Sequence, residues 1–535
     1  MDYKRFGVML DVSRNGVMQV SQVKKYIDYI ARMGYNVLEL YAEDLYEVEG
    51  EPYFGYLRGV YTSAQLKEID AYAISKGVEL IPCIQTLAHF TNMAKLPHYW
   101  HLFDCHDILL IDNEEVYEFI DKIFASLAKN FTSREVNIGM DEAHFVGLGK
   151  YLEKHGYHNR SEILVRHLGR VSEIAKKYGF TCHMWSDMFF RLINNGEYYS
   201  DNIDQVTIAP EILAKVPENV GLTYWDYYSM ERKKYDSMFK KHFEFGCDVW
   251  FAGGAWTWQG FSPMNAFSLK TMSLAMESVR DNGIENVLVT VWGDNGKECS
   301  YFSILPSLYA IRQFADGNFD MDSIKAGFKA EFGFDFDGWM KLDLPHVWSV
   351  EGKVNDEWDC MHKTMFYTDP FLGWRDVEYA RLDPVPFAEY AKELAKAGEN
   401  AGEFAYIFDA MAKLCKYLEY KAPLGVLTRK AYKAGKEELA KVLVNYDEAV
   451  KYLDIFKDAF QKEWFKENKP FGWEIHDIRT AGVRSRILSC KARIQAYLNG
   501  ELDTIEELDA ELLPAEDRNG FMYHMYKVAI SPSEI

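Results

Sequence analysis

Apolar and polar positions form two alternating patterns over the N-terminal part of the chain. Short apolar runs rich in β-branched residues predict buried strands, and segments whose apolar residues recur every three or four positions predict amphipathic helices. The helical patterns separate the apolar runs, as expected where parallel strands are joined by helical crossovers. The predicted strands cover residues 6–12, 36–42, 78–85, 134–141, 180–187, 220–226, 248–254 and 287–294.

The helical segments support one closed arrangement of these strands. Clear helical patterns include residues 22–34, 114–130 and 161–179, whereas the interval after the fifth strand is the least regular. Several helices end on a glycine just before the next strand, where a left-handed C-cap is expected; these are Gly34, Gly77, Gly179, Gly246 and Gly283. Eight such units predict an α/β fold, the (β/α)8 TIM barrel. A doubly wound sheet is the alternative, but no G-x-G-x-x-G turn follows the first strand.

The strand signal fades after about residue 335. Residues 385–465 and 476–498 are rich in Ala, Lys, Glu and Leu and predict long helices. We therefore expect two domains, a catalytic barrel of residues 1–335 and a mainly helical C-terminal domain of residues 336–535. Residues 469–487 are unusually apolar and aromatic, which predicts packing either on the barrel or on a second copy in a homodimer.

Composition and charge limit the kinds of molecule that the chain is expected to bind. The formal net charge of −21 disfavours binding to nucleic acid and to anionic membrane surfaces. The N-terminus has no signal-peptide pattern and no apolar stretch is long enough to span a bilayer, so we expect a cytoplasmic protein. Its 8 cysteines are scattered without a C-x-x-C pair, which favours reduced thiols over a metal cluster. A neutral or mildly cationic small substrate fits this charge best, and the sequence implies no metal or cofactor.

The predicted strand ends carry candidate chemistry, because active sites of TIM barrels lie at the carboxyl ends of their strands. Carboxylates and indoles dominate there, which suits sugar chemistry: a carboxylic acid protonates the leaving oxygen and flat aromatic rings stack on the sugar. These positions are Asp11, Arg14, Glu39, Glu43, Asp44, Gln85, His89, Asp141, Glu142, His144, Trp185, Asp187, Trp225, Asp226, Tyr227, Trp256, Trp258, Trp292, Asp294 and Glu298.

Several of these segments resemble one family. The sequence IGMDEAH at residues 138–144 resembles the G-x-D-E signature of glycoside hydrolase family 20, the β-N-acetylhexosaminidases. The segments at 7–14, 36–44, 81–89 and 291–294 are similar to further strand motifs of that family, in the same order. The resemblance implies hydrolysis of terminal β-linked GlcNAc or GalNAc from a small glycan substrate, without a cofactor.

The resemblance also implies a substrate-assisted mechanism with net retention. The 2-acetamido oxygen of the substrate would attack the anomeric carbon and give an oxazolinium intermediate. Glu142 would act as the general acid and then as the base, and Asp141 would hold the acetamide N–H and stabilise the intermediate. By the same match, His89 would lie beside this pair.

Sugar-binding roles follow from the same match. Asp44 and Asp294 would contact hydroxyl groups. The walls of the pocket for the N-acetyl group would be formed by Trp185, Trp225 and Trp292. Arg14 is expected to replace a strand-one arginine of the family, since Arg5 is one residue out of step and would point to the other face. The expected substrate-binding residues are Arg14, Glu39, Asp44, His89, Trp185, Trp225, Tyr227, Trp256, Trp292 and Asp294.

The chain departs from the family pattern at several positions. Glu39 stands where a histidine is more usual, and Gln85 stands where an aspartate is. The segment GGAWTW at residues 253–258 replaces a tyrosine motif, so the hydrogen-bond partner of the acetamide oxygen is open, with Tyr227 as a candidate. The small α/β domain that precedes the barrel in the usual member has no counterpart in the sequence. These changes leave the choice between GlcNAc and GalNAc open.

Other interpretations remain at this stage. Asp141 and Glu142 could cap a helix, His89 could be a core histidine, and Glu39 and Glu298 could form structural ion pairs with Arg14 or Lys297. Three other functions compete: a retaining barrel glycosidase for O-linked or peptide-linked GlcNAc, a non-catalytic carbohydrate-binding barrel, and a metal-dependent barrel hydrolase. The last would use His89, Asp141, Glu142 and His144.

Overall fold

The computed structural model describes residues 2–199, 201–355, 360–514 and 525–533. The chain forms two compact units. The first comprises Met1–Ala255, Ser268–Val291 and Leu308–Phe319, and the second Trp256–Phe267, Trp292–Ser307 and Asp320–Ile535. The domain boundary expected near residue 335 stays a prediction, because this grouping does not cut the chain at one point.

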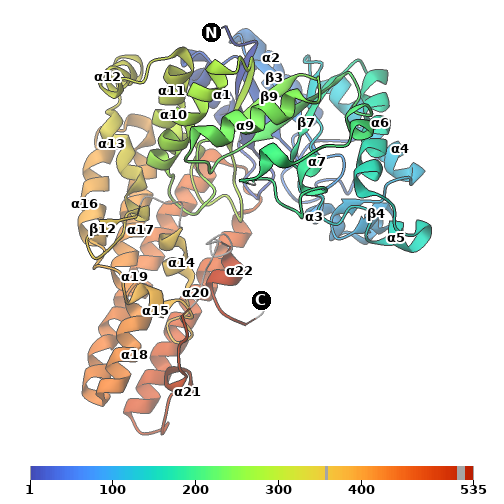
Figure 1. The fold of residues 1–535 in the computed structure, drawn as a ribbon. Helices are drawn as coiled ribbons and strands as arrows, with labels where there is room; N and C mark the ends of the chain where they lie inside the picture. The colour runs from blue at the N-terminus through green and yellow to red at the C-terminus, as the bar shows by residue number, and fades with distance from the viewer. Residues whose placement is uncertain (1, 200, 356–359, 515–524, 534–535) are drawn as a thin grey trace. The chain divides into compact units, whose positions relative to one another are not determined.

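The first unit contains a closed barrel of eight parallel strands (Figure 1), which confirms the predicted fold class. Around the barrel the strand order is β1-β10-β9-β8-β7-β6-β3-β2. All eight predicted strands are present, although the fourth is shorter than expected because the chain turns after Asn137. The strands are β1 (Arg5–Asp11), β2 (Val37–Tyr41), β3 (Glu79–Cys83), β6 (Glu135–Asn137), β7 (Thr181–Trp185), β8 (Val220–Trp225), β9 (Val249–Gly254) and β10 (Asn286–Val291).

Amphipathic helices connect the strands, as predicted. The chief ones are α1 (Val20–Arg32), α2 (Ser63–Ser75), α4 (Glu114–Asn130), α6 (Arg160–Lys177), α9 (Arg232–Phe243), α10 (Asn265–Asp281) and α11 (Leu305–Asp316). All five predicted C-cap glycines have positive φ, between 67° and 88°. After β7 the chain forms only the short helices α7 (Asp187–Arg191) and α8 (Pro210–Leu213), which explains the weak pattern in that interval. A short hairpin of β4 (Phe103–Cys105) and β5 (Ile108–Leu109) follows β3.

The barrel interior is apolar with a few paired polar groups. His183 of β7 stacks on Trp250 of β9, with ring centroids 4.0 Å apart and planes 1° from parallel. At the amino ends of the strands, Arg5 pairs with Glu79 at 3.1 Å and with Glu135 at 3.3 Å. Arg5 therefore lies at the end of the barrel remote from the carboxyl ends of the strands.

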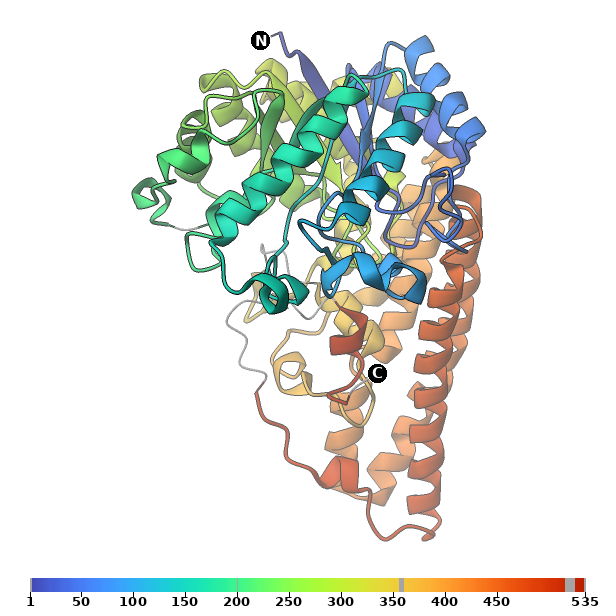
Figure 2. The same ribbon diagram turned by 90° about the vertical axis from the view of Figure 1, so that its right-hand side faces the viewer.

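The second unit is mainly helical, as predicted for the C-terminal region. Its longest elements are α16 (Phe387–Gly398), α17 (Ala405–Lys421), α18 (Leu424–Ala434), α19 (Lys436–Glu467) and α20 (Trp473–Leu498). α17 packs against α16 and α19, and α20 packs along α19 (Figure 2). The aromatic segment predicted at residues 469–487 is partly buried within this unit, where Trp473 contacts Phe460 and Trp464. Among the described helices, none combines the length and apolar character that a membrane span requires.

Candidate active site

Left-handed backbone places the two acidic residues at the carboxyl end of β6. Gly139 and Met140 both have φ of 72°, and Glu142 has φ of 51°. A side chain at residue 139 would collide with Gln85, since its Cβ would lie 2.2 Å from Oε1 of that amide. The turn needs this space because Oε1 of Gln85 also accepts the Met140 N–H at 3.2 Å. The backbone thus bends sharply where the sequence predicted a continued strand, and Asp141 and Glu142 project from this bend.

His89, Asp141 and Glu142 form the centre of the site. Nε2 of His89 lies 3.1 Å from Oδ2 of Asp141 and 3.7 Å from Oε2 of Glu142. Gln85 donates from Nε2 to the other oxygen of Asp141 at 2.8 Å. The side chain of Asp141 is 12% exposed, whereas that of Glu142 is 42% exposed. One carboxylate is therefore held from two sides, and its neighbour is open to a ligand.

Electrostatics fixes the charge of the held pair. Burial lowers the pKa of His89, but the carboxylates of Asp141 and Glu142 outweigh burial and raise that pKa to about 10. Burial alone would raise the pKa of Asp141, but the positive charge and hydrogen bond of His89 and the Gln85 amide bring it below the usual range. Near neutral pH the site therefore holds an imidazolium beside an ionised Asp141.

A second group of side chains faces Glu142 from β7, α7 and β8. Asp187, the first residue of α7, accepts the Glu142 N–H at 3.1 Å and the Nε–H of Arg191 at 2.9 Å. A guanidinium nitrogen of Arg191 lies 3.9 Å from Oε1 of Glu142. The guanidinium also lies 5.8 Å from the ring centroid of Trp225, which stacks on Tyr227 at 5.4 Å. Two predicted aromatic residues are thereby connected to the acidic pair.

Arg14 and Glu43 contribute a third group, at the ends of β1 and β2. Arg14 pairs with Asp11 at 3.1 Å and with Glu43 at 3.5 Å, and its guanidinium lies 4.8 Å from the centroid of the Tyr41 ring. Burial raises the pKa of Glu43 to about 6, against the opposing charge of Arg14. The Tyr41 hydroxyl donates to Glu43 at 3.1 Å and accepts from Gln85 at the same distance, which joins this group to Asp141.

Three other predicted residues lie in different surroundings. Glu39 is fully buried in β2, with Oε1 3.0 Å from Nε2 of His183 inside the barrel. Asp44 is buried and forms an ion pair with Arg58. Trp185 ends β7 and is 1% exposed. Glu39 thus has a structural ion pair, but its partner is His183 rather than Arg14.

The remaining predicted residues belong to the second unit. Trp256 stacks on Trp258 with ring centroids 4.3 Å apart. The carbonyl of Trp292 accepts the Thr257 hydroxyl at 2.7 Å, and Asp294 follows in the same segment, half-buried. The site roles expected for Trp256, Trp292 and Asp294 therefore stay predictions.

Glu298, also in the second unit, has strong ionic partners. It lies 2.6 Å from Nζ of Lys363 and 3.2 Å from Arg479. Lys297, the partner suggested by the sequence, pairs instead with Glu467 at 3.2 Å.

Three further members of the site, Gln85, Glu43 and Asp187, were predicted as strand-end candidates without an assigned role. Sequence reasoning missed a fourth member, Arg191. No signal in the sequence marked it, because it lies on a short helix in the least regular interval of the chain.

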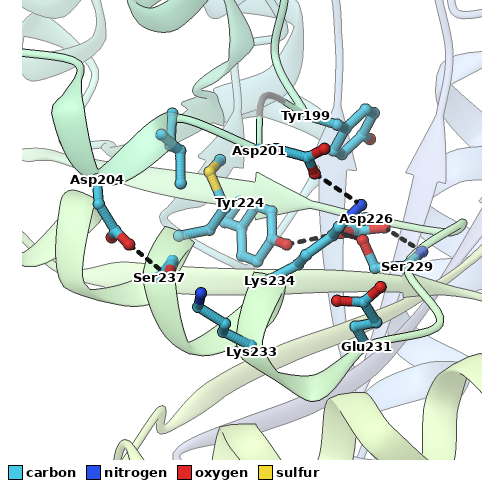
Figure 3. Close-up of a pocket in the computed structure, with 12 residues that line it drawn as sticks. Tyr199, Asp201, Asp204, Tyr224, Asp226, Ser229, Glu231, Lys233, Lys234 and Ser237 are labelled. Atoms are coloured by element: carbon cyan, nitrogen blue, oxygen red, sulfur yellow. Dashed lines mark hydrogen bonds and ion pairs between the residues drawn. The ribbon is translucent and has the colours of Figure 1, made fainter.

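A separate cavity of about 240 Å³ lies between β8, α9 and a segment that contributes Tyr199, Asp201, Ile203 and Asp204 (Figure 3). Its polar groups are largely paired with one another: Asp226 accepts the hydroxyls of Tyr224 at 2.7 Å and of Ser229 at 2.5 Å, and Lys234 pairs with Asp201 at 3.2 Å. Neither Asp141 nor Glu142 lines it. Within the described ranges, no group of three or more His, Cys, Asp and Glu side chains has an arrangement suited to a metal ion.

Comparison with known protein families gives a match for each of two long segments of the chain. Residues 3–227 match the catalytic domain of glycosyl hydrolase family 20, and residues 337–526 match the glycoside hydrolase 20C C-terminal domain. A beta-hexosaminidase of Akkermansia muciniphila is 26% identical over 169 residues, which is 26% of this chain and 34% of that protein. The chain thus matches about a third of the length of that relative.

Solved structures give remote likenesses. The exo β-N-acetylglucosaminidase of Vibrio harveyi has 17% identity and a TM-score of 0.46, over 63% of this chain and 58% of that one. The β-N-acetylhexosaminidase of Bacteroides fragilis has 19% identity and a TM-score of 0.46, over 61% of this chain and 70% of that one.

Proposed function

The chain belongs to glycoside hydrolase family 20, and from this premise we propose that it is an exo-acting, retaining β-N-acetylhexosaminidase. The proposed substrate is a glycan with a terminal, non-reducing β-linked GlcNAc or GalNAc. One observation carries the proposal: an ionised Asp141, held by His89 and Gln85, stands next to a partly exposed Glu142 at the carboxyl end of a barrel strand.

The two carboxyl groups suit different parts of the reaction. A substrate-assisted mechanism needs one acid that reaches the leaving oxygen and one anion that stabilises a cationic ring. Glu142 has the exposed carboxyl group, and Asp141 has the buried negative charge. We therefore assign proton transfer to Glu142, and assign to Asp141 the acetamide N–H and the positive charge of the intermediate.

The proposed reaction has two steps. In the first, Glu142 gives its proton to the glycosidic oxygen while the acetamide oxygen attacks the anomeric carbon. The bond from that carbon to the leaving oxygen breaks, an alcohol departs, and the oxazolinium ion remains. In the second, the carboxylate of Glu142 takes a proton from water, whose oxygen attacks the anomeric carbon and reopens the ring. Two inversions at one carbon give the sugar with retained configuration.

The surrounding residues have proposed binding roles. Trp185 and Trp225 would wall the N-acetyl pocket, Tyr227 would donate a hydrogen bond to the acetamide oxygen, and Arg14 would bind a sugar hydroxyl group. The contact of Arg191 with both Glu142 and Trp225 supports this assignment for Trp225. The roles of Asp44, Trp256, Trp292 and Asp294 rest on the family resemblance alone, and we propose none for Glu39 because it is fully buried.

Hydrolysis of aryl β-N-acetylglucosaminides and β-N-acetylgalactosaminides tests the proposal, with Glu142→Gln as the variant. We expect a loss in kcat of about 10²- to 10⁴-fold, the usual contribution of a general acid. The loss should be larger for alkyl aglycones than for nitrophenyl aglycones, because a poor leaving group depends more on protonation. Glu162→Gln, an exposed acid on α6, is the matched control and should keep full activity.

A further pair of measurements separates the mechanism from the class. The matching aryl β-glucosides, which lack the acetamide, should not be hydrolysed, and proton NMR should show the β-anomer as the first product. Hydrolysis of the glucosides at a similar rate would contradict substrate assistance. A folded wild type that hydrolyses neither hexosaminide would overturn the proposed function.

A further inference from the structure

Glu142 has a backbone conformation that costs free energy. Its φ of 51° lies in the left-handed region, which is unfavourable for a residue with a side chain. Such strain persists at functional sites only where neighbouring groups compensate for it. The direction of the carboxyl group depends on this conformation, because the side chain of Glu142 projects from the bend. A group that stabilises the bend therefore also directs the proposed acid.

Asp187 is placed to do this. Its Oδ2 atom accepts the Glu142 N–H at 3.1 Å, across from β7 to the turn after β6. The side chain is fully buried, so water does not compete for this hydrogen bond. Asp187 takes no part in the proposed chemical steps, and its other oxygen, Oδ1, has no hydrogen-bond partner among the residues that the structure describes.

Arg191 extends the contact from the backbone to the side chain. It follows Asp187 by four residues, one turn of helix, and donates from Nε to the same oxygen, Oδ2, at 2.9 Å. A terminal nitrogen of its guanidinium lies 3.9 Å from Oε1 of Glu142. Arg191 is itself held over aromatic faces, 5.6 Å from the centroid of Tyr198 and 5.8 Å from that of Trp225. The pair thus reaches both the amide and the carboxylate of Glu142.

We propose that Asp187 is a positioning residue: together with Arg191 it holds Glu142 in its left-handed conformation and directs its carboxyl group toward the leaving oxygen. The catalytic consequence rests on the proposed function, whereas the structural claim does not. A glycosidase loses catalytic rate when its general acid is misplaced, since a shift of about 1 Å at a reacting group lowers the rate roughly 100-fold.

The cost of burying Asp187 supports a role of this kind. Burial, together with the negative charges of Asp141 and Glu142, raises the pKa of its carboxyl group to about 7 against the opposing charge of Arg191. A buried carboxylate near two others is unfavourable for folding, so stability alone does not account for it.

Two substitutions separate the hydrogen bond from the charge. Asp187→Ala removes the acceptor, and Asp187→Asn keeps an amide oxygen that can accept the Glu142 N–H. Asp70→Ala is the matched control, since Asp70 of α2 is another buried acid that accepts a loop N–H group, that of Thr132 at 3.2 Å, and belongs to neither the proposed catalytic nor the proposed binding residues. Arg191→Met, which removes the second member of the pair, replaces Asp187→Ala if that variant does not fold.

Two measurements are made on each variant of the full chain. The first is hydrogen exchange by mass spectrometry in peptides that cover residues 138–146. The second is kcat and KM with an aryl β-N-acetylhexosaminide. We expect faster exchange in these peptides for Asp187→Ala, a fall in kcat of about 10- to 100-fold, and a nearly unchanged KM. Asp187→Asn should restore slow exchange and most of kcat, and the Asp70 control should change neither.

Unchanged exchange and unchanged kcat in Asp187→Ala would overturn the proposal. So would an Asp187→Asn variant as impaired as Asp187→Ala in both measurements, because the carboxylate charge rather than the hydrogen bond would then be responsible. If the wild type hydrolyses no hexosaminide, the proposed function fails, but the exchange measurement still decides whether Asp187 holds the turn at Glu142.

Discussion

Two clusters of buried charge, one in each unit, differ in how their charges balance. Around Asp141 in the first unit, three carboxylates share one imidazolium and one guanidinium. Around Glu298 in the second unit, one carboxylate lies within 2.6 Å of Lys363 and 3.2 Å of Arg479, and accepts the Tyr367 hydroxyl at 2.7 Å. In the first cluster, negative charges outnumber positive charges. In the second cluster, positive charges outnumber the negative one.

The pKa values follow this difference. Burial raises the pKa of Glu298, but Lys363 and Arg479 outweigh burial and bring it below the usual range. The pKa of Asp187, by contrast, is raised to about 7 by burial, with Asp141 adding to the effect. A carboxylate surrounded by opposite charge needs no ligand, whereas a cluster with unbalanced like charges is well suited to bind or transfer a proton. The contrast favours a structural role for the second cluster and supports the catalytic role proposed for the first.

The largest expected effect on stability comes from Glu298→Ala. This change would leave Lys363 and Arg479 buried without their common partner, and breaking such a pair costs about 3–5 kcal/mol. Chemical denaturation of the wild type and the variant measures the loss in free energy of unfolding. A loss below about 1 kcal/mol, the value for exposed ion pairs, would mean that the cluster does not carry the structural role assigned to it.

A smaller effect, but one that depends on pH, is expected for His89→Gln. The folded pKa of His89, about 10, lies above its unfolded value of about 6.5, so the stabilisation is full below pH 6.5 and is lost as the pH rises through 10. The folded pKa of Asp141 is lowered, so its contribution is lost as the pH falls below about 4.

The difference in unfolding free energy between wild type and His89→Gln should therefore be largest between about pH 4 and pH 6.5 and should shrink toward pH 10. Its size should be at least about 1.4 kcal/mol, the equivalent of one pKa unit. Denaturation curves at pH 6 and pH 10 measure it. An equal difference at both pH values would show that the pair is not ionised as described.

The smallest effect is expected for Arg484→Ala, in the same unit as Glu298. Arg484 lies 2.9 Å from Asp454, but both side chains are nearly half exposed, at 45% and 48%. Water screens such a pair, so its removal should cost no more than about 1 kcal/mol. Denaturation under the conditions used for Glu298→Ala provides the direct comparison, and an equal loss in both variants would remove the distinction between buried and exposed pairs.

The sequence predicted the barrel well because its signal is local. Each strand is a buried apolar run, and each connecting helix repeats its own pattern, so eight independent signals supported one fold. The fourth strand was predicted too long, since Ile138 to Asp141 continues the apolar pattern while the backbone turns left-handed at Gly139 and Met140. Backbone conformation of that kind depends on the space left by Gln85, which no local pattern reveals.

The site was harder to predict because its members meet only in the fold. Asp141, Glu142 and His89 were predicted from motifs. The structure places the carboxylates of Asp141 and Glu142 within 3.7 Å of the His89 imidazole. Asp187 and Arg191 lie on a five-residue helix that follows the neighbouring strand, and they contact Glu142 from there. The sequence spacing gave no sign of these contacts. Strand-end position marks candidates, and only tertiary contacts show which of them act together.

Gly139 and Gln85 have a consequence for how this protein can change by mutation. A Cβ at residue 139 would lie 2.2 Å from the amide oxygen of Gln85, whose nitrogen holds Asp141. Shortening residue 85 would remove that contact and release Asp141, but the carbonyl oxygen of Ile84 would still lie 2.7 Å from the Cβ, and the φ of 72° would still favour glycine. Position 139 is therefore closed to larger residues even through a compensating change at residue 85. Libraries that vary both positions together should return glycine at 139.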